Sequence, residues 1–203
     1  MGVKLITIPG TAIGIRTRNG VVLASEKRVA YEGFILSKQA RKVYPITSRA
    51  GVAFAGLVGD IGYLTKILKL EAKHYELQQG KELKTRSLAK ILSVILYSYK
   101  LFPMFTEVIV GGYDEEGSAL FVLDPVGSLL EERYAAVGSG AQLALGYIEP
   151  RYKEDLDLTE AEKIAVEAIK TVIERDVLSG DGVDILVFTK EGYTTKEYLF
   201  KTT

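Results

Sequence analysis

The order in which β-rich and helical segments follow one another constrains the fold more than any other feature of this sequence. Two apolar, β-rich runs at 12–17 and 21–27 flank Arg18-Asn19-Gly20. An Asn-Gly pair between such runs is a strong signal for a β-hairpin. Hairpin-linked strands with helices grouped in pairs are typical of α+β folds and not of alternating βαβ units. The expected fold class is therefore α+β, in one domain of 203 residues.

The remaining elements follow from apolar periodicity and turn residues. Further strands are expected near 34–36, 41–46, 51–58, 105–112, 118–123, 128–137 and 183–189. Helices are expected near 60–78, 88–99, 139–152 and 159–178. Asp60 is the expected N-cap of the first helix, and Thr159-Glu160-Ala161-Glu162 has the form of a capping box for the last. Two antiparallel sheets packed face to face, with a helix pair on each outer surface, would bury every apolar stripe.

Composition excludes several classes of function. The chain has no cysteine, which excludes a thiol nucleophile, a Cys-ligated zinc site and a disulfide framework, and suits a cytoplasmic setting. Lys+Arg and Asp+Glu balance at 26 each, so no global basic field favours nucleic acid or an anionic membrane. His74 is the single histidine, which leaves no Ser-His-Asp triad and no histidine metal cluster. The single Asn and two Met residues favour a thermophilic source.

Five short segments carry the residues that suit chemistry. They are Gly10-Thr11-Ala12-Ile13-Gly14, Ser37-Lys38-Gln39-Ala40-Arg41-Lys42-Val43, Ala55-Gly56-Leu57-Val58-Gly59-Asp60, Gly138-Ser139-Gly140 and Asp176-Val177-Leu178-Ser179-Gly180-Asp181-Gly182. In this order around the hairpin they resemble the motifs of archaeal-type proteasome β subunits of the 20S core particle, from Gly10 to Thr189. The resemblance implies an N-terminal-nucleophile (Ntn) hydrolase with a four-layer αββα sandwich, that is, two antiparallel sheets flanked by helix pairs.

The resemblance also implies a leader that is removed by autocatalytic cleavage. In these enzymes the freed N-terminal threonine attacks with its hydroxyl, and its own α-amino group accepts the proton. Residues 1–10 would then be the leader, 11–203 the single β-type domain and Thr11 the nucleophile. The leader has four aliphatic side chains, which is too short for the apolar region of a signal peptide and for a membrane span.

Other site residues take their expected roles from the same resemblance. Lys42 is expected beside the nucleophile, where a cation lowers the pKa of the attacking hydroxyl. Glu26 stands where the family has an aspartate that orients this lysine, so either the lysine shifts or the pairing loosens. The N–H of Gly56 is expected to face the substrate oxyanion. The hydrogen-bonded group around the α-amine matches Ser139, Asp176 and Ser179.

One residue is out of register with this family. Counting back without a gap from Gly14 and Gly20, the nucleophile's position falls on Gly10, and Thr11 follows one residue too late. Because side chains alternate along a strand, a chain cut before Thr11 would point its hydroxyl away from Lys42. Two hypotheses remain open: a threonine peptidase that uses Thr11, and a silent subunit that completes the ring beside an active paralogue.

The resemblance finally implies an assembly. Such subunits form seven-membered rings stacked on α-type rings, and the chamber degrades unfolded proteins in an ATP-dependent pathway. The expected partners are the α-type ring, other β-type subunits and unfolded polypeptide, without nucleic acid or membrane. No cofactor and no metal are expected at the site. A bacterial-type two-ring relative that works with an unfolding ATPase is a third hypothesis.

Overall fold

The computed structural model describes residues 7–200, which form two five-stranded antiparallel sheets and a separate hairpin. The first sheet consists of β1 (Thr11–Thr17), β2 (Gly20–Glu26), β10 (Tyr134–Gly138), β11 (Gly182–Thr189) and β12 (Gly192–Leu199). The second consists of β5 (Val43–Pro45), β6 (Ala50–Gly56), β7 (Thr106–Asp114), β8 (Gly117–Leu123) and β9 (Leu129–Glu131). The hairpin pairs β3 (Val29–Tyr31) with β4 (Phe34–Ser37). The sheet orders are β10-β1-β2-β11-β12 and β5-β6-β7-β8-β9.

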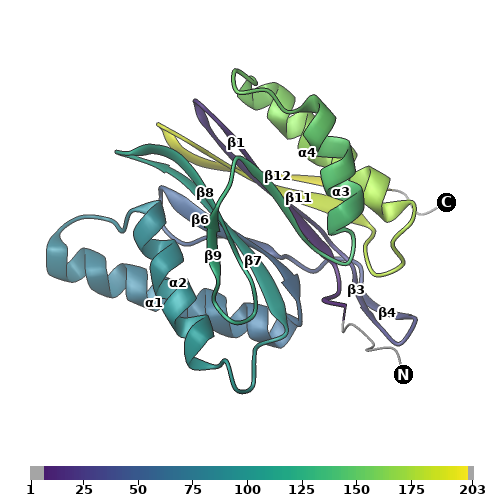
Figure 1. Ribbon diagram of the computed structural model, residues 1–203, viewed down its shortest axis with the longest axis horizontal. Coiled ribbons are helices and arrows are strands. Elements are labelled where there is room, and N and C mark those ends of the chain that lie inside the picture. Colours follow the sequence, from purple (N-terminus) through teal and green to yellow (C-terminus); the bar gives the residue numbers. More distant parts are fainter. Residues whose placement is uncertain (1–6, 201–203) are drawn as a thin grey trace.

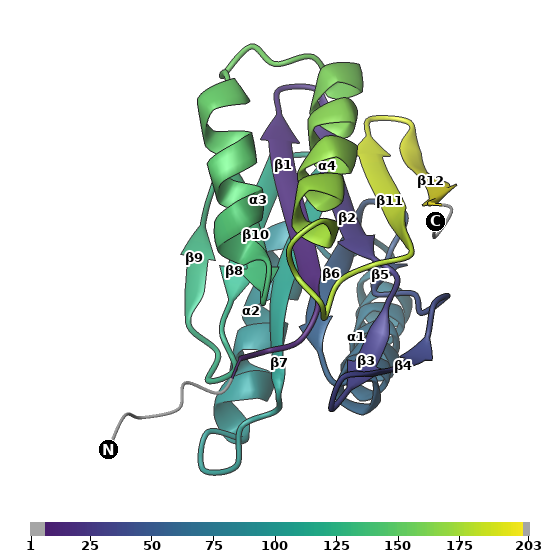
Figure 2. The same cartoon turned by 90° about the vertical axis from the view of Figure 1, so that its right-hand side faces the viewer.

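A pair of helices covers the outer face of each sheet (Figure 1). The second sheet carries α1 (Val58–Gln79) and α2 (Thr85–Ser98), whose apolar faces pack on β6, β7 and β8. The first sheet carries α3 (Ala141–Ile148), the 3-10 turn η1 (Glu149–Arg151) and α4 (Leu158–Ile173). Figure 2 shows α3 and α4 side by side over β1 and β10. The expected α+β class and four-layer αββα sandwich are confirmed.

A third apolar layer lies between the two sheets. Its buried members are Ala12, Val21, Leu23, Val43, Ala53, Ala55, Ile109, Leu120, Ala135, Val137, Leu186 and Phe188. Fully burying a side chain such as Leu or Phe stabilises a fold by about 1.5–3 kcal/mol. The sheets approach closely at Gly14, where a Cβ would lie 2.7 Å from Leu120 Cδ1. The core is thus layered in the order that the apolar stripes of the sequence require.

Several expected helix boundaries are wrong. The first helix begins at Val58 with Leu57 as its N-cap, so Asp60 is not the cap. Instead, the Asp60 carboxylate accepts the N–H of Phe105 at 2.8 Å and joins the helix start to the chain before β7. The expected capping box is also wrong, because the N-cap of α4 is Asp157, which accepts the N–H of Thr159 at 3.1 Å.

The third and the last helix are shorter than expected. The third begins at Ala141 and continues as the 3-10 turn to Arg151, against an expected span of 139–152. The last ends at Ile173 rather than near Leu178. The segment that follows α4 is therefore a loop, and this loop carries two of the expected site residues.

The strands differ from expectation in three places. The hairpin at Asn19-Gly20 is confirmed, with Arg18 and Asn19 as its loop and Gly20 as the first residue of β2. The single run expected at 128–137 is two strands, β9 and β10, which belong to different sheets. β3 and β12 were not expected; β12 is almost entirely exposed and polar, so it lacks a buried face that period-2 alternation would reveal.

Strand direction gathers the motifs at one end of the sandwich. β1 begins at Thr11, which pairs with Gly138 at the end of β10. β2 ends at Glu26, opposite the start of β11, and β6 ends at Gly56, opposite the start of β7. The loop between α4 and β11 closes the same end. The fold thereby brings together segments that lie up to about 170 residues apart.

Candidate active site

A buried ion pair forms one half of the candidate site. Glu26 and Lys42 are 0% and 2% exposed. The Lys42 ammonium donates to Glu26 Oε1 and, over 2.6 Å, to the carbonyl of Arg28. Glu26 Oε2 accepts the N–H of Arg28 at 2.6 Å and that of Gly180 at 3.1 Å. Burial raises the pKa of the Glu26 carboxyl, while the Lys42 ammonium and the backbone N–H donors act in the opposite direction.

Gly10 lies directly against this ion pair. Its φ of +86° falls in the region that favours glycine. A Cβ on Gly10 would lie 2.7 Å from Glu26 Oε1 and 2.8 Å from Lys42 Nζ. Residue 10 is therefore the position from which a side chain would point at the ammonium.

Thr11 points its hydroxyl elsewhere. The residue is fully buried, and its N–H donates to Glu26 Oε1 at 3.2 Å. Its Oγ1 lies 2.8 Å from Ser179 Oγ and accepts the N–H of Gly140 at 3.1 Å. The hydroxyl thus faces Ser179 and Gly140 and not Lys42, in agreement with the alternation of side chains along a strand.

Asp176 organises the second half of the site. Its Oδ2 accepts the hydroxyl of Ser139 at 2.6 Å and the hydroxyl of Ser179 at 2.7 Å. Because a carboxylate only accepts, the Ser179 hydroxyl donates a hydrogen bond to Asp176 and accepts one from the Thr11 hydroxyl. With the Gly140 N–H as its donor partner, the Thr11 hydroxyl is held from two sides.

The carbonyl oxygens of Pro9 and Gly10 accept hydrogen bonds from different backbone donors. The N–H of Gly56 donates to the Pro9 oxygen at 2.9 Å. The N–H of Ser139 donates to the Gly10 oxygen at 2.9 Å. Gly56 has φ +133°, and a Cβ there would lie 2.7 Å from Thr106 Cα, so only glycine fits this turn. The expected oxyanion donor is therefore engaged by residue 9 of the chain itself.

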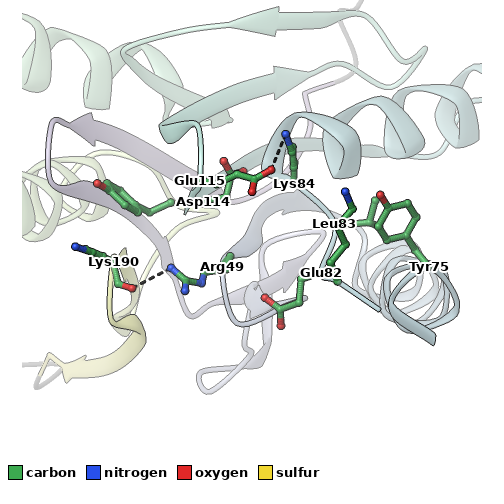
Figure 3. Close-up of a pocket in the computed structure, with 10 residues that line it drawn as sticks. Arg49, Tyr75, Glu82, Leu83, Lys84, Asp114, Glu115 and Lys190 are labelled. Atoms are coloured by element: carbon green, nitrogen blue, oxygen red, sulfur yellow. Dashed lines mark hydrogen bonds and ion pairs between the residues drawn. The ribbon is translucent and has the colours of Figure 1, made fainter. Parts of the chain in front are cut away.

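A small cavity of about 40 Å³ adjoins these groups. It is lined by Pro9, Gly10, Arg28, Val29, Ala30, Lys42, Gly56, Leu57, Val58 and Leu178. A larger cavity of about 570 Å³ lies at the opposite end of the sandwich, where Lys84 pairs with Glu115 and Arg49 donates to the Lys190 carbonyl (Figure 3). We place the candidate active site at the smaller cavity, because the ion pair and the hydroxyl network meet there.

A comparison with known families decides the classification. The family model described as "Proteasome subunit" matches residues 7–188. The chain belongs to the proteasome subunit family. It is 68% identical over 198 residues to "Proteasome subunit beta 1" of Desulfurococcus amylolyticus, covering 98% of both chains. It is 58% identical over 195 residues to "Proteasome subunit beta 1" of Staphylothermus marinus, covering 96% of this chain and 92% of the relative.

All seven residues that the proteasome resemblance singled out lie in this one region. They are Thr11, Glu26, Lys42, Gly56, Ser139, Asp176 and Ser179. Glu26 pairs directly with Lys42 despite its longer side chain, so the pairing is not loosened. Thr11 departs from the family's arrangement in the direction that its register predicts: its hydroxyl joins the Asp176 network and does not face Lys42.

Two further residues position the proteasome motifs and were not expected from the sequence. The Arg28 guanidinium donates to Asp181 at 2.9 Å and to the Val177 carbonyl at 3.2 Å, which fastens the loop after α4 to the ion-pair half. Glu107 on β7 accepts the N–H of Gly138 at 2.7 Å. Arg28 lies two residues after Glu26 in the sequence, but its partners lie about 150 residues away, and no spacing rule connects them.

The part of the chain that the structure describes offers neither a group of metal ligands nor a membrane-spanning helix. Between residues 7 and 200, no three His, Asp or Glu side chains are grouped as metal ligands. No helix in that range is long and apolar enough to cross a membrane.

Proposed function

We propose that this chain takes a β-type position in a cytoplasmic proteasome core particle, where it adjoins an α-type ring and other β-type subunits. The complex hydrolyses peptide bonds by the threonine-type mechanism, and unfolded polypeptide is its substrate. The observation that carries the proposal is the set formed by the buried Lys42, Glu26 and Gly56 and the half-buried Ser139 and Asp176 at one end of the sandwich. This set contains a cation, an amide donor and a carboxylate, which acyl transfer by an N-terminal hydroxyl requires.

Within that complex, the first candidate role is catalytic. Removal of residues 1–10 would free the Thr11 amine, which would accept the hydroxyl proton through a water molecule. The hydroxyl would then attack the substrate carbonyl, the Gly56 N–H would stabilise the oxyanion, and water would hydrolyse the acyl ester. For this role the Thr11 hydroxyl has to leave Ser179 and turn towards Lys42.

The second candidate role is structural, and one observation favours it. Gly10, which has no hydroxyl, occupies the position beside Lys42. A displacement of about 1 Å from attack geometry costs on the order of 10²-fold in rate. The names of the two relatives do not indicate a silent subunit, whereas the placement of Gly10 beside Lys42 favours one. A silent chain would complete the ring wall beside an active paralogue.

The intact mass of the chain separates these roles. The chain is co-expressed with an α-type and a sister β-type subunit, and the assembled particle is isolated and assayed for peptide cleavage. A mass that lacks residues 1–10 means cleavage at Gly10–Thr11, and the catalytic role holds. A full-length chain inside a peptide-cleaving particle means that the sister subunit supplies the nucleophile. A chain that stays out of the particle overturns the proposal itself.

A further inference from the structure

We infer that the cavity at the end of the sandwich opposite the candidate active site binds a small anion that carries two or more phosphate groups. This far cavity has a volume of about 570 Å³ and is lined by α1, the loop that leads to α2, and the turns beside β6, β7 and β11 (Figure 3). Small-molecule sites typically have volumes of about 300–1,000 Å³. The inference goes beyond the proposed function and does not depend on the role of Thr11.

Two carboxylates that line the far cavity are already bound by backbone and hydroxyl donors of the chain itself. The oxygens of Glu82 accept the N–H of Ser48 at 3.1 Å and its hydroxyl at 2.7 Å. The oxygens of Asp114 accept the N–H groups of Thr85 at 2.7 Å and of Glu116 at 2.9 Å. Neither carboxylate is paired with a cation of the cavity, although both lie on its wall.

The other carboxylates at this end of the sandwich have partners as well. Glu115 and Glu116 both pair with Lys84, at 2.7 and 2.8 Å. Glu191 in the β11–β12 turn accepts the hydroxyl of Thr189 at 2.8 Å. Lys84 is therefore matched by two carboxylates, and the acidic groups around the far cavity are engaged.

Three cations that line the far cavity have no such partner. Arg49, Lys81 and Lys190 form no ion pair with any carboxylate among residues 7–200. Arg49 is half-buried, and the two lysines are exposed. Charges of one sign that border a concave site raise the local concentration of ions of the opposite sign. The charge that remains unmatched in this cavity is therefore positive, and a ligand that neutralises it is an anion.

Arg49 is the preorganised member of this group. Its Nη1 donates to the Lys190 carbonyl at 2.9 Å, and its own carbonyl accepts the N–H of Tyr113 at 2.9 Å. The residue is held at its backbone and at the tip of its side chain, so binding a ligand costs less side-chain entropy. The bond to Lys190 uses one of the five guanidinium N–H groups. The planar guanidinium therefore keeps donors in the fork geometry that matches two oxygens of a phosphate.

The arrangement of the cations favours a compact ligand over an acidic polypeptide. Arg49, Lys81 and Lys190 come from three different connections between elements and border one cavity, whereas an extended acidic chain would require cations along a line. Linked phosphate groups place several negative charges within such a volume. Tyr75 and Tyr113 add aromatic surface to the lining, against which a nucleotide base could stack. Free polyphosphate and a nucleotide share this chemistry, and the test separates them.

The test measures the binding of inorganic triphosphate to the full chain by calorimetry, in a buffer free of phosphate, sulfate and divalent cations. The wild type is expected to bind one triphosphate per chain. Arg49→Ala is expected to raise Kd by at least about tenfold, the size of a lost hydrogen bond between charged groups. Lys81→Ala and Lys190→Ala are expected to raise it about three- to fivefold each, because both ammonium groups are exposed. Lys66→Ala on the exposed face of α1, outside the far cavity, is the matched control, with an expected change within about twofold.

Two results overturn the inference. One is a wild-type chain that shows no saturable binding of triphosphate. The other is an equal loss of binding in Lys66→Ala and Arg49→Ala, which would mean a general attraction to surface charge. Where Arg49→Ala does not fold, Lys190→Glu replaces it, because this reversal removes no ion pair from the described part of the chain. Lys190→Glu is expected to raise Kd by at least about tenfold, and unchanged binding in this variant also overturns the inference.

Further probes in the same assay identify the source of the phosphate groups. ATP that binds at least about tenfold more tightly than triphosphate supports a nucleotide whose base stacks on a tyrosine of the cavity. Equal affinities for ATP and triphosphate support a free polyphosphate. A glutamate-rich peptide that binds more tightly than either overturns the inference, because the recognised group would then be a carboxylate. The assay uses the chain by itself, so a failure to enter the particle, which bears on the proposed function, leaves this result unaffected.

Discussion

Two buried lysine–carboxylate pairs lie back to back at the end of β2, and they differ in what remains open beside them. Glu26 faces the candidate site and pairs with Lys42, while the next residue, Lys27, faces the opposite side and pairs with Asp184 at 2.9 and 3.0 Å. Lys27 also reaches Glu197 on β12 at 2.7 Å. The Lys42 pair borders Gly10 at the start of β1, whereas Asp184 and Glu197 line a separate cavity of about 170 Å³ away from the candidate site. Burial of an ion pair therefore does not by itself distinguish a structural pair from a catalytic one; the groups beside it do.

The two carboxylates also differ in their other partners. Glu26 accepts the N–H groups of Thr11, Arg28 and Gly180 in addition to the Lys42 ammonium. For Asp184, Lys27 is the single hydrogen-bond donor found among residues 7–200. A charge that keeps backbone donors tolerates the loss of its ion partner better than a charge that has none. Removal of Lys27 alone and removal of Lys42 alone should therefore lower the free energy of unfolding by unequal amounts.

The largest effect is expected for Lys27→Ala. The variant leaves Asp184 buried without a partner, which lowers the free energy of unfolding by about 3–5 kcal/mol. Urea denaturation of the full chain measures this. Lys66→Ala on the exposed face of α1 is the matched control, with an expected change within about 0.5 kcal/mol. A cost for Lys27→Ala close to that of the control would show that Asp184 is protonated or solvated when its ion partner is removed.

Lys42→Ala is expected to cost less, about 1.5–3 kcal/mol, because three backbone N–H groups stay on Glu26. Burial already raises the pKa of the Glu26 carboxyl, so the loss of the opposing ammonium further favours its neutral form. The same denaturation assay compares both variants. A cost equal to that of Lys27→Ala would contradict the difference drawn between the pairs.

This contrast also explains how much of the site was readable from the sequence. Lys42 and Glu26 were found because they match residues of the family, and the pair of Lys27 with Asp184 was not found, because nothing in its spacing marks it. The offset between Gly10 and Thr11 was predictable, since strand alternation follows from counting. That the Gly56 amide holds the Pro9 carbonyl was not, because it depends on how the chain enters β1.

The fold was predictable to a similar depth. Apolar periodicity located both helix pairs and most strands, because each buries one face. It missed β12, whose pairing with β11 is backbone hydrogen bonding under an exposed, polar surface. It also misplaced two helix starts. The first helix begins after Leu57, which has no side-chain cap for the sequence to reveal, and the last is capped by Asp157 in place of the nearby Thr159.

A smaller effect is expected from pH. Burial lowers the pKa of Lys27, but the hydrogen bonds that its ammonium donates to Glu197 and Asp184 outweigh it, and the pKa is raised above its usual 10.5. A group whose pKa is raised on folding stabilises fully below its unfolded pKa, and this stabilisation is lost as the pH rises through the folded value. The difference in unfolding free energy between wild type and Lys27→Ala should therefore be constant from pH 8 to 10 and shrink above 10.5. A difference that grows with pH would mean that folding lowers the pKa of Lys27 and does not raise it.

The smallest effect is expected for the hydroxyls, where the same contrast between satisfied and open groups applies. Thr11→Val keeps the shape of a buried side chain but removes the bond to Ser179 and leaves the Gly140 N–H without its acceptor, at a cost of about 1 kcal/mol. Thr65→Val is the matched control. Thr65 Oγ1 is buried without a hydrogen-bond partner among the described residues, so its removal is expected to be neutral or stabilising. Equal destabilisation of both variants in urea would mean that the Thr11 hydroxyl is not held by the Asp176 network, and that it is free to turn towards Lys42.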